Sequence, residues 1–152
     1  MRKAFVLSVV FVLACSICHA HDNAKAKQYL NLYSQCDGKQ IGKSLFMMKP
    51  DIFVSKIKSG EEVFVLDVRT KAEEQIVGMN IPNTLFVPMN KVFEESTLSK
   101  LPTDKPIVVL CRKGVRSSLV TMGLRDIGFN NAFCLHDGLR GLIEFLTPKA
   151  AN

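Results

Sequence analysis

The sequence predicts an α/β domain with a central, mostly parallel five-stranded sheet and helices on both faces. Three observations predict this fold class. From residue 45 onward, short apolar runs alternate with amphipathic stretches, which is the element order of α/β folds. Within each run, apolar residues stand side by side, as in strands that helices cover on both faces. The 152 residues are 47% hydrophobic and 22% charged, which fits one folded domain and excludes disorder over the whole length.

The expected strands are five apolar runs of four or five residues. They cover residues 45–48, 63–66, 84–87, 107–110 and 131–135. The expected helices lie between them. Residues 51–59 and 90–101 carry apolar side chains at helical spacing. A third apolar stripe runs from residue 119 to residue 127, and Gly128 follows it as a C-terminal cap.

The N-terminus has the features of an export signal. A cationic start precedes an almost uninterrupted apolar stretch over residues 4–14, which is shorter than the roughly 20 residues of a membrane-spanning helix. We expect residues 1–20 to be a cleaved signal peptide, and the mature protein to be periplasmic or secreted without an integral membrane span. In the alternative interpretation, residues 12–15 form a lipobox that leaves Cys15 as a lipidated N-terminus.

Removal of this segment changes what the composition implies. Two basic residues leave with it, so the formal net charge falls from +6 to +4. No run of five or more like charges occurs, and we therefore expect no nucleic-acid partner. The mature chain then consists of a polar lead-in with one or two helical turns, residues 21–44, the α/β domain, residues 45–146, and a C-terminal tail, residues 147–152.

Three cysteines remain after this removal: Cys36, Cys111 and Cys134. Thiols tend to pair in an oxidising compartment, and an odd number leaves at least one that is either buried and inert or kept for chemistry. Cys36 can pair with Cys134 or with another chain, and the sequence leaves both open. No pair outside residues 1–20 has the CxxC spacing of a zinc site, so we expect neither a metal nor another cofactor.

One of these cysteines stands among cations. Cys111 directly follows the fourth expected strand, and a short loop with Gly114 leads from it into a helix. Ligands of open α/β sheets bind at the carboxyl ends of strands. Arg112, Lys113 and Arg116 place three cations within five residues, and the beginning of the helix adds its positive end. The thiolate is therefore favoured over the thiol.

The backbone of the same loop is suited to hold an anion. Gly114 tolerates the angles that turn several N–H groups toward one point. The alternative is a buried structural cysteine with arginines that decorate a helix. An inert thiol gains nothing from three neighbouring cations, so the pattern favours an anion-binding nucleophile.

These residues resemble the rhodanese, or thiosulfate sulfurtransferase, family. The loop 111–116, CRKGVR, is similar to the active-site loop of thiosulfate:cyanide sulfurtransferases. Residues 66–69, LDVR, followed by Glu73 and Glu74, are similar to the first family signature, and residues 78–84 to the stretch after it. The resemblance covers the whole expected domain in family order. Three positions depart from the family pattern: Met79 replaces a histidine, Asp137 replaces the first glycine of a Gly-Gly turn, and Leu142 replaces the tryptophan of the last helix.

The resemblance implies a persulfide mechanism. Cys111 attacks the outer sulfur of thiosulfate or of a persulfide donor, and a thiol or cyanide acceptor then removes that sulfur. A protein is a possible donor or acceptor as well. The implied substrate-binding residues are Arg112, Lys113, Gly114, Val115 and Arg116. A sulfur-carrier or anion-binding module without catalysis is the alternative function.

Loop length separates this chemistry from phosphatase activity. Four residues lie between Cys111 and Arg116, one fewer than in protein phosphatases of related architecture, whose loop must hold the larger phosphate. We therefore expect no phosphatase.

Residues near the loop are interpreted as supports. Asp67 and Arg69 are expected to form a charge pair that braces the end of the second strand, with Ser117 as a further support. His136 is interpreted as a turn histidine without a catalytic role. Cys134 lies in a strand expected next to that of the nucleophile, where it either resolves the persulfide or is a buried core cysteine, the second being favoured.

Overall fold

The computed structural model describes residues 21–34, 36 and 41–147. The expected signal peptide, the lipobox at Cys15 and residues 148–152 of the expected tail lie outside this part of the chain. Among the helices of the described part, none is both long and apolar enough to cross a bilayer.

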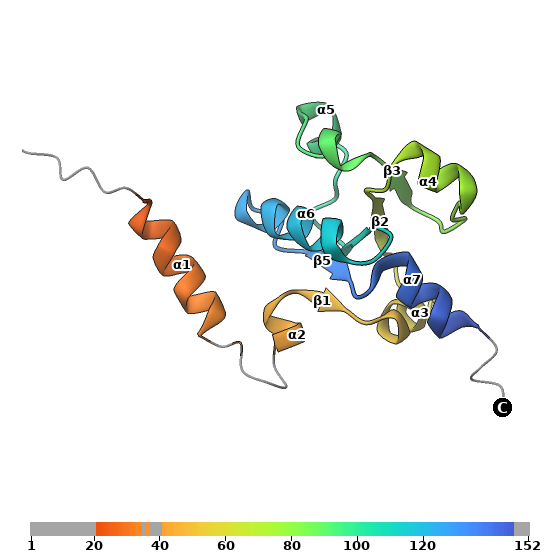
Figure 1. Cartoon of the computed structure of the whole chain (residues 1–152), viewed down its shortest axis with the longest axis horizontal. Helices are drawn as coiled ribbons and strands as arrows, with labels where there is room; N and C mark the ends of the chain where they lie inside the picture. Colours follow the sequence, from red (N-terminus) through yellow and green to blue (C-terminus); the bar gives the residue numbers. More distant parts are fainter. Residues whose placement is uncertain (1–20, 35, 37–40, 148–152) are drawn as a thin grey trace, which may run out of the picture.

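A five-stranded sheet in which every pair of strands is parallel lies at the centre of the molecule (Figure 1). The spatial order of the strands is β1-β5-β4-β2-β3. Their bounds are β1 Met47–Met48, β2 Phe64–Asp67, β3 Thr84–Phe86, β4 Ile107–Leu110 and β5 Ala132–Leu135. The α/β fold class is confirmed, and each strand falls within or next to one of the five apolar runs.

Helices cover both faces of the sheet. On one face lie α3 (Pro50–Lys58) and α7 (Gly138–Leu146), and on the other lie α6 (Val115–Asp126), the short 3-10 helix η2 (Met89–Lys91) and α5 (Glu95–Leu98). The helix α4 (Lys71–Ile76) connects β2 to β3, while α1 (Asn23–Tyr33) and α2 (Ile41–Ser44) precede the sheet. Figure 1 shows α1 at one end of the molecule and α7 toward the other.

Successive strand residues belong to two separate cores. In β4, Val108 and Leu110 pack with the α3 and α7 side chains, whereas Val109 and the following Cys111 pack with those of α6. All four are buried. This two-sided burial is the reason that apolar residues stand next to one another in the strands.

The lead-in is more helical than expected, because α1 has 11 residues instead of one or two turns. Its N-cap is Asp22, whose carboxylate accepts hydrogen bonds from the N–H groups of Ala24 and Lys25. Lys25 also forms an ion pair with Asp126 at the end of α6. Large apolar side chains occur only in the second half of this helix, so periodicity did not reveal its full length.

The expected helix over residues 90–101 is broken into η2 and the single turn of α5. Glu94 has extended backbone angles, φ −69° and ψ 141°, and the Thr97 hydroxyl donates to the carbonyl of Lys91 at 3.0 Å. A threonine hydroxyl that takes a backbone carbonyl in this way competes with the regular helix. The apolar side chains Val92 and Leu101 still reach the core.

The strand order places the site. The chain leaves β2 toward β3 on one side and leaves β4 toward β5 on the other, so neighbouring strands β2 and β4 flank the point at which connections diverge. Crevices at such points bind ligands in open parallel sheets. Asp67 is in register with Leu110, and the segments that follow these two residues therefore begin side by side.

Candidate active site

Cys111 is the first residue after β4, and its sulfur lies inside the loop that leads into α6. Cys111 Sγ accepts a hydrogen bond from the Gly114 N–H at 3.2 Å and lies 3.4 Å from Ser117 Oγ. Gly114 has φ 91°, a left-handed conformation that lets the loop turn back on the sulfur. Only 1% of the Cys111 surface is exposed.

Opposing effects set the charge of this thiol. Burial raises the pKa of Cys111, but hydrogen bonds from the Ser117 hydroxyl and from the N–H groups of Ser117, Lys113 and Gly114 lower it by more. The pKa therefore lies below its ordinary value. Hydrogen bonds to the charged form and the nearby beginning of a helix are what stabilise a thiolate in proteins.

The first turn of α7 holds the cysteine loop from the other side. The N–H of Leu139 donates to the Cys111 carbonyl at 2.8 Å, and the N–H of Arg140 donates to the Arg112 carbonyl at 3.1 Å. Donors that a helix start leaves unpaired are thus used to fix the loop. Gly138 is required for this approach, because a Cβ at that position would lie 2.2 Å from the Cys111 carbonyl oxygen.

The backbone conformation of Asp137 explains why an aspartate can replace the first glycine of the family's Gly-Gly turn. Asp137 has φ 54°, a conformation that aspartate tolerates better than most residues. Its carboxylate lies 3.2 Å from both the His136 ring and the Arg140 guanidinium. His136 is half exposed in this turn.

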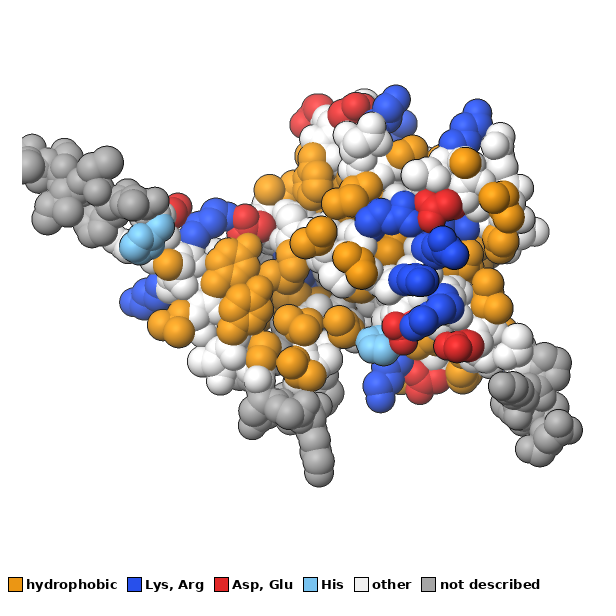
Figure 2. Space-filling view, in the orientation of Figure 1, with side chains coloured by type: hydrophobic (Ala, Val, Ile, Leu, Met, Phe, Trp, Pro, Cys, Tyr) orange, Lys and Arg blue, Asp and Glu red, His pale blue; other side chains and the backbone are white. Residues whose placement is uncertain are grey.

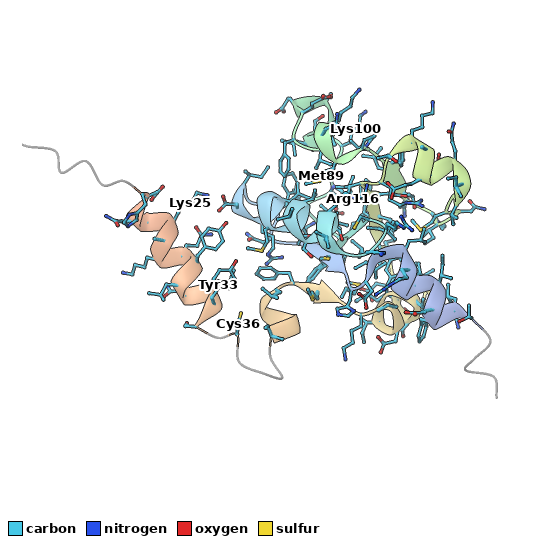
Figure 3. The ribbon with its side chains drawn as sticks, viewed as in Figure 1. Lys25, Tyr33, Cys36, Met89, Lys100 and Arg116 are labelled. Carbon is cyan, nitrogen blue, oxygen red and sulfur yellow. The ribbon has the colours of Figure 1, made fainter. Side chains whose placement is uncertain are left out.

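Arg116 is fixed by an acidic partner from α4. Its guanidinium donates to both carboxylate oxygens of Glu73, at 2.7 and 2.8 Å, and Figure 3 shows Arg116 at the beginning of α6 on the side of α4. The bond from Arg116, together with those from the Thr70 N–H and hydroxyl, lowers the pKa of Glu73 to about 2. The bond to Glu73 raises the pKa of Arg116, with a smaller contribution from Cys111. Arg116 therefore interacts electrostatically with both the Glu73 carboxylate and the Cys111 sulfur.

The remaining loop residues face outward. Arg112 and Lys113 are exposed, and neither takes part in an ion pair with the described residues. Figure 2 shows Lys and Arg side chains gathered on the face between α4 and α7. The family resemblance implied Val115 as a substrate-binding residue. Its side chain is 70% exposed and therefore does not line the sulfur cradle.

Asp67 and Arg69 form a buried ion pair. Arg69 Nη2 donates to Asp67 Oδ2 at 2.6 Å, and Arg69 Nε donates to both carboxylate oxygens. Arg69 Nη1 continues to the carbonyls of Val77 at 2.7 Å and Glu73 at 3.4 Å. The pair therefore ties the end of β2 to both ends of α4 and, through them, supports the residue that holds Arg116.

A cavity of about 480 Å³ opens between α4 and α7 beside the loop. Its apolar wall consists of Ile76, Val77, Leu139 and Ile143, and its charged lining consists of Arg69, Glu73, Arg112, Arg140 and Glu144, with Thr147 completing it. Glu73 and Arg112 connect this cavity to the cysteine loop, since one holds Arg116 and the other follows Cys111.

The three described cysteines are free thiols. Cys134 is buried in β5, with its sulfur 3.3 Å from Ser117 Oγ and 3.4 Å from Ser118 Oγ. Cys36 lies in a different place, where its sulfur faces the Leu32 carbonyl at 3.6 Å. Within the described residues, no three His, Cys, Asp or Glu side chains form a group able to hold a metal ion.

Sequence reasoning did not assign Glu73 to the site. A local signal was present, because Thr70 and Glu73 have the spacing of a capping box. The Thr70 hydroxyl accepts from the Glu73 N–H, and the Glu73 carboxylate accepts from the Thr70 N–H at 2.9 Å. That motif predicts where α4 begins, but pairing with Arg116, 43 residues away, depends on the sheet order.

Cys111 thus lies in a cradle of hydrogen-bond donors directly after a parallel strand, beside a switch point of an α/β sheet and among cations. The family model described as rhodanese-like domain matches residues 49–144. The chain therefore belongs to the rhodanese-like domain family, as the motifs predicted.

Relatives and solved structures agree with this assignment. The chain is 31% identical over 84 residues to a sulfurtransferase of Allochromatium vinosum, covering 55% of this chain and 75% of that protein. It is 31% identical over 92 residues to the probable adenylyltransferase/sulfurtransferase MoeZ of Mycobacterium tuberculosis, covering 60% of this chain but only 23% of that protein. The crystal structure of a rhodanese-like domain protein from Staphylococcus aureus superposes with a TM-score of 0.56 at 25% identity, covering 63% of this chain and 89% of that one.

Proposed function

We propose that this protein is a sulfurtransferase in which Cys111 carries sulfane sulfur as a persulfide. The observation that supports this most is the environment of Cys111 Sγ, which is buried yet surrounded by hydrogen-bond donors, with the Gly114 N–H at 3.2 Å. Such donors stabilise negative charge on sulfur in both the thiolate and the persulfide. Relatives named as sulfurtransferases lend further support.

In the first half of the reaction, the Cys111 thiolate attacks the outer sulfur of thiosulfate or of another sulfane donor. The new bond joins the two sulfurs, and the bond between the outer sulfur and the sulfonate breaks. Sulfite leaves with the electron pair, and the enzyme is left as the Cys111 persulfide. No proton needs to move, so the reaction requires no histidine acid or base.

In the second half, a nucleophilic acceptor attacks the outer sulfur of the persulfide. Cyanide leaves as thiocyanate, or a thiolate leaves as its own persulfide, and the Cys111 thiolate is restored. The cavity between α4 and α7 offers such an acceptor a route to the loop, because Arg112 lines it and directly follows Cys111.

The cations have two roles in this mechanism. Arg112 and Lys113 are exposed and attract an anionic donor to the mouth of the loop. Arg116 is held by Glu73 and therefore presents a fixed positive charge to the sulfur. Charge that is positioned before the reaction is more effective than charge that must reorganise during it.

The decisive test is the mass of the Cys111 peptide after incubation with thiosulfate. We expect one added sulfur atom on this peptide, loss of that atom on addition of cyanide or a thiol, and no addition in Cys111→Ser. Cys36→Ser, which changes a cysteine in α1's neighbourhood instead of the loop, is the matched control and keeps the addition. An unmodified Cys111 peptide after incubation with thiosulfate and with a persulfide donor contradicts the proposal.

The same experiment, together with a measurement of thiosulfate affinity, separates the alternative functions. A persulfide that forms but is not turned over by cyanide or thiols supports a sulfur carrier that delivers to a partner protein. An anion-binding domain without sulfur chemistry keeps its affinity for thiosulfate in Cys111→Ala and loses it in Arg116→Ala.

We also propose that the chain is exported and that residues 1–20 are removed as a signal peptide. The support is the cationic start followed by an apolar stretch that is too short for a typical membrane span. The intact mass of the mature protein tests this, because cleavage at residue 20 and lipidation of Cys15 give different masses. An uncleaved chain in the producing cell contradicts export by this signal.

A further inference from the structure

Two buried thiols in this protein share one hydroxyl group. Ser117 Oγ lies 3.4 Å from Cys111 Sγ and 3.3 Å from Cys134 Sγ, and all three residues are at most 1% exposed. Cys134 pairs in register with Val109, two residues before Cys111, so both cysteines lie on the α6 face of the sheet. The proposed reaction uses only one of these thiols.

The direction of the hydrogen bonds follows from counting acceptors around Gly114. Ser117 Oγ has one hydrogen, and besides Cys111 it can donate to the Gly114 carbonyl at 2.9 Å. That carbonyl also receives the N–H of Ser118 at 2.9 Å and the Ser118 hydroxyl at 2.8 Å. A carbonyl oxygen has two lone pairs, which the Ser118 N–H and hydroxyl can fill. The negatively charged Cys111 thiolate is a stronger acceptor than a neutral carbonyl, so we assign the Ser117 hydrogen to the Cys111 sulfur.

The same count assigns the Cys134 hydrogen. Its sulfur lies 3.7 Å from the Gly114 carbonyl, 3.5 Å from the carbonyl of Leu135, 3.4 Å from Ser118 Oγ and 3.3 Å from Ser117 Oγ. Ser117 Oγ is the nearest of these acceptors, and its lone pairs are free when its hydrogen points at Cys111. The three groups then form a chain in which each donates to the next.

The two thiols have opposite tendencies to ionise, which suits these roles. Burial raises the pKa of Cys134, with a smaller contribution from the nearby Cys111 sulfur, and this outweighs the lowering by the Ser117 and Ser118 hydroxyls. Cys134 accordingly keeps its hydrogen and acts as a donor, while the pKa of Cys111 is lowered.

We propose that Cys134 is a positioning residue for the nucleophile: its S–H donates to Ser117 Oγ and thereby commits the Ser117 hydrogen to Cys111 Sγ. Hydrogen bonds in such a chain polarise and strengthen one another. This inference rests on the proposed function, because it takes Cys111 as the nucleophile. Its test nevertheless needs no sulfur donor.

The test is the rate at which iodoacetamide alkylates Cys111, followed by peptide mass spectrometry as a function of pH. Cys134→Val removes the donor and adds one methyl group, Cys134→Ala removes it without adding volume, and Cys134→Ser replaces it with a hydroxyl. At pH values below the titration midpoint, we expect the valine variant to have a Cys111 thiolate fraction about two- to four-fold lower than that of the unmodified protein. We expect the serine variant to stay within about two-fold of the unmodified protein.

A double-mutant cycle shows whether Cys134 acts through Ser117. Ser117→Ala alone raises the titration midpoint of Cys111, and adding Cys134→Val to it has no further effect if the chain operates as described. Leu135→Val is the matched control, since this neighbour in β5 packs in the opposite core and its shortening leaves the midpoint unchanged. We expect Cys134→Ala to raise the titration midpoint of Cys111 as the valine variant does, and it is used in place of the valine variant if that one does not fold.

Two results overturn the inference: an unchanged midpoint in both Cys134→Val and Cys134→Ala, or an equal shift by Cys134→Val with and without the Ser117 hydroxyl. Failure of the proposed function is distinguishable from both. In that case Cys111 alkylates with the expected pH dependence and still takes up no sulfur.

Discussion

At the scale of single residues, the lowered pKa of the Cys111 thiol gives the first prediction. Because the pKa of this thiol is lowered, its alkylation persists at pH values at which an ordinary cysteine, with a pKa of about 8.5, is protonated. We expect its alkylation midpoint to lie below that of a cysteine in an unstructured model peptide, and peptide mass spectrometry measures both. Equal midpoints contradict an activated nucleophile.

The buried pair of Asp67 and Arg69 gives a prediction about stability. Arg69→Leu leaves the Asp67 carboxylate buried without its countercharge, with only the N–H of residue 69 as a partner, which costs about 3–5 kcal/mol of unfolding free energy. Lys105→Ala is the control, because its partner Glu62 is 70% exposed and such surface pairs contribute at most about 1 kcal/mol. Urea unfolding measures both, and similar losses in the two variants contradict the bracing role of the buried pair.

Glu73 makes stability depend on pH in a defined window. Its pKa is about 2 in the folded protein and 4.5 ordinarily, so its pairing stabilises the fold fully above pH 4.5 and is lost as the pH falls toward 2. We expect Glu73→Gln to lose stability relative to the unmodified protein at neutral pH and to converge with it in acid. Glu74→Gln is the control, because Glu74 forms no ion pair with the described residues. A stability difference for Glu73→Gln that does not change with pH contradicts this origin.

At the scale of elements, the start of α4 is set by its capping box. Thr70→Ala removes the hydroxyl that accepts from the Glu73 N–H and costs about 1 kcal/mol. Thr70→Ser keeps an acceptor and is expected to lose much less. Thermal unfolding distinguishes the variants, and equal losses show that the cap is not what stabilises this turn.

The contact between α7 and the cysteine loop leads to a prediction about activity. Gly138→Ala introduces a Cβ 2.2 Å from the Cys111 carbonyl oxygen, so the loop must move and sulfur transfer is expected to fall by at least about ten-fold. Gly128→Ala is matched, because Gly128 also has a positive φ, of 111°, but a Cβ there meets nothing within 4 Å. Both variants lose stability through strain, and only the first loses activity per folded molecule. Equal activity losses contradict the loop-holding role of α7.

The predictability of each element followed from its length and its burial. The apolar runs in β2, β4 and β5 indicated strands because helices cover both of their faces. By contrast, α4 has six residues, too few to show a period, and α1 is stabilised by its N-cap and a distant ion pair instead of an apolar stripe. Over residues 90–101 the apolar period was real, but the Thr97 hydroxyl breaks the helix that it suggested.

At the scale of the whole molecule, the cysteine loop was predictable because Cys111, Gly114 and Arg116 lie within six consecutive residues. Contacts that cross the fold were not. The pairing of Arg116 with Glu73, the seating of α7 on the loop and the sharing of Ser117 by two cysteines all depend on the order of the strands. Periodicity and local motifs contain no information about which strands become neighbours.

The edge strand β1 has a consequence for the order of events during synthesis. It pairs only with β5 among the described strands, through Met47 with Cys134 and Met48 with Leu135. A ribosome needs on the order of ten seconds to make the residues between these partners. For that time β1, and the lead-in that precedes it, has no sheet to join. The earliest part of the domain to be synthesised is therefore among the last to dock. Until β5 has been made, the unpaired edge of β1 is accessible to chaperones and to other chains.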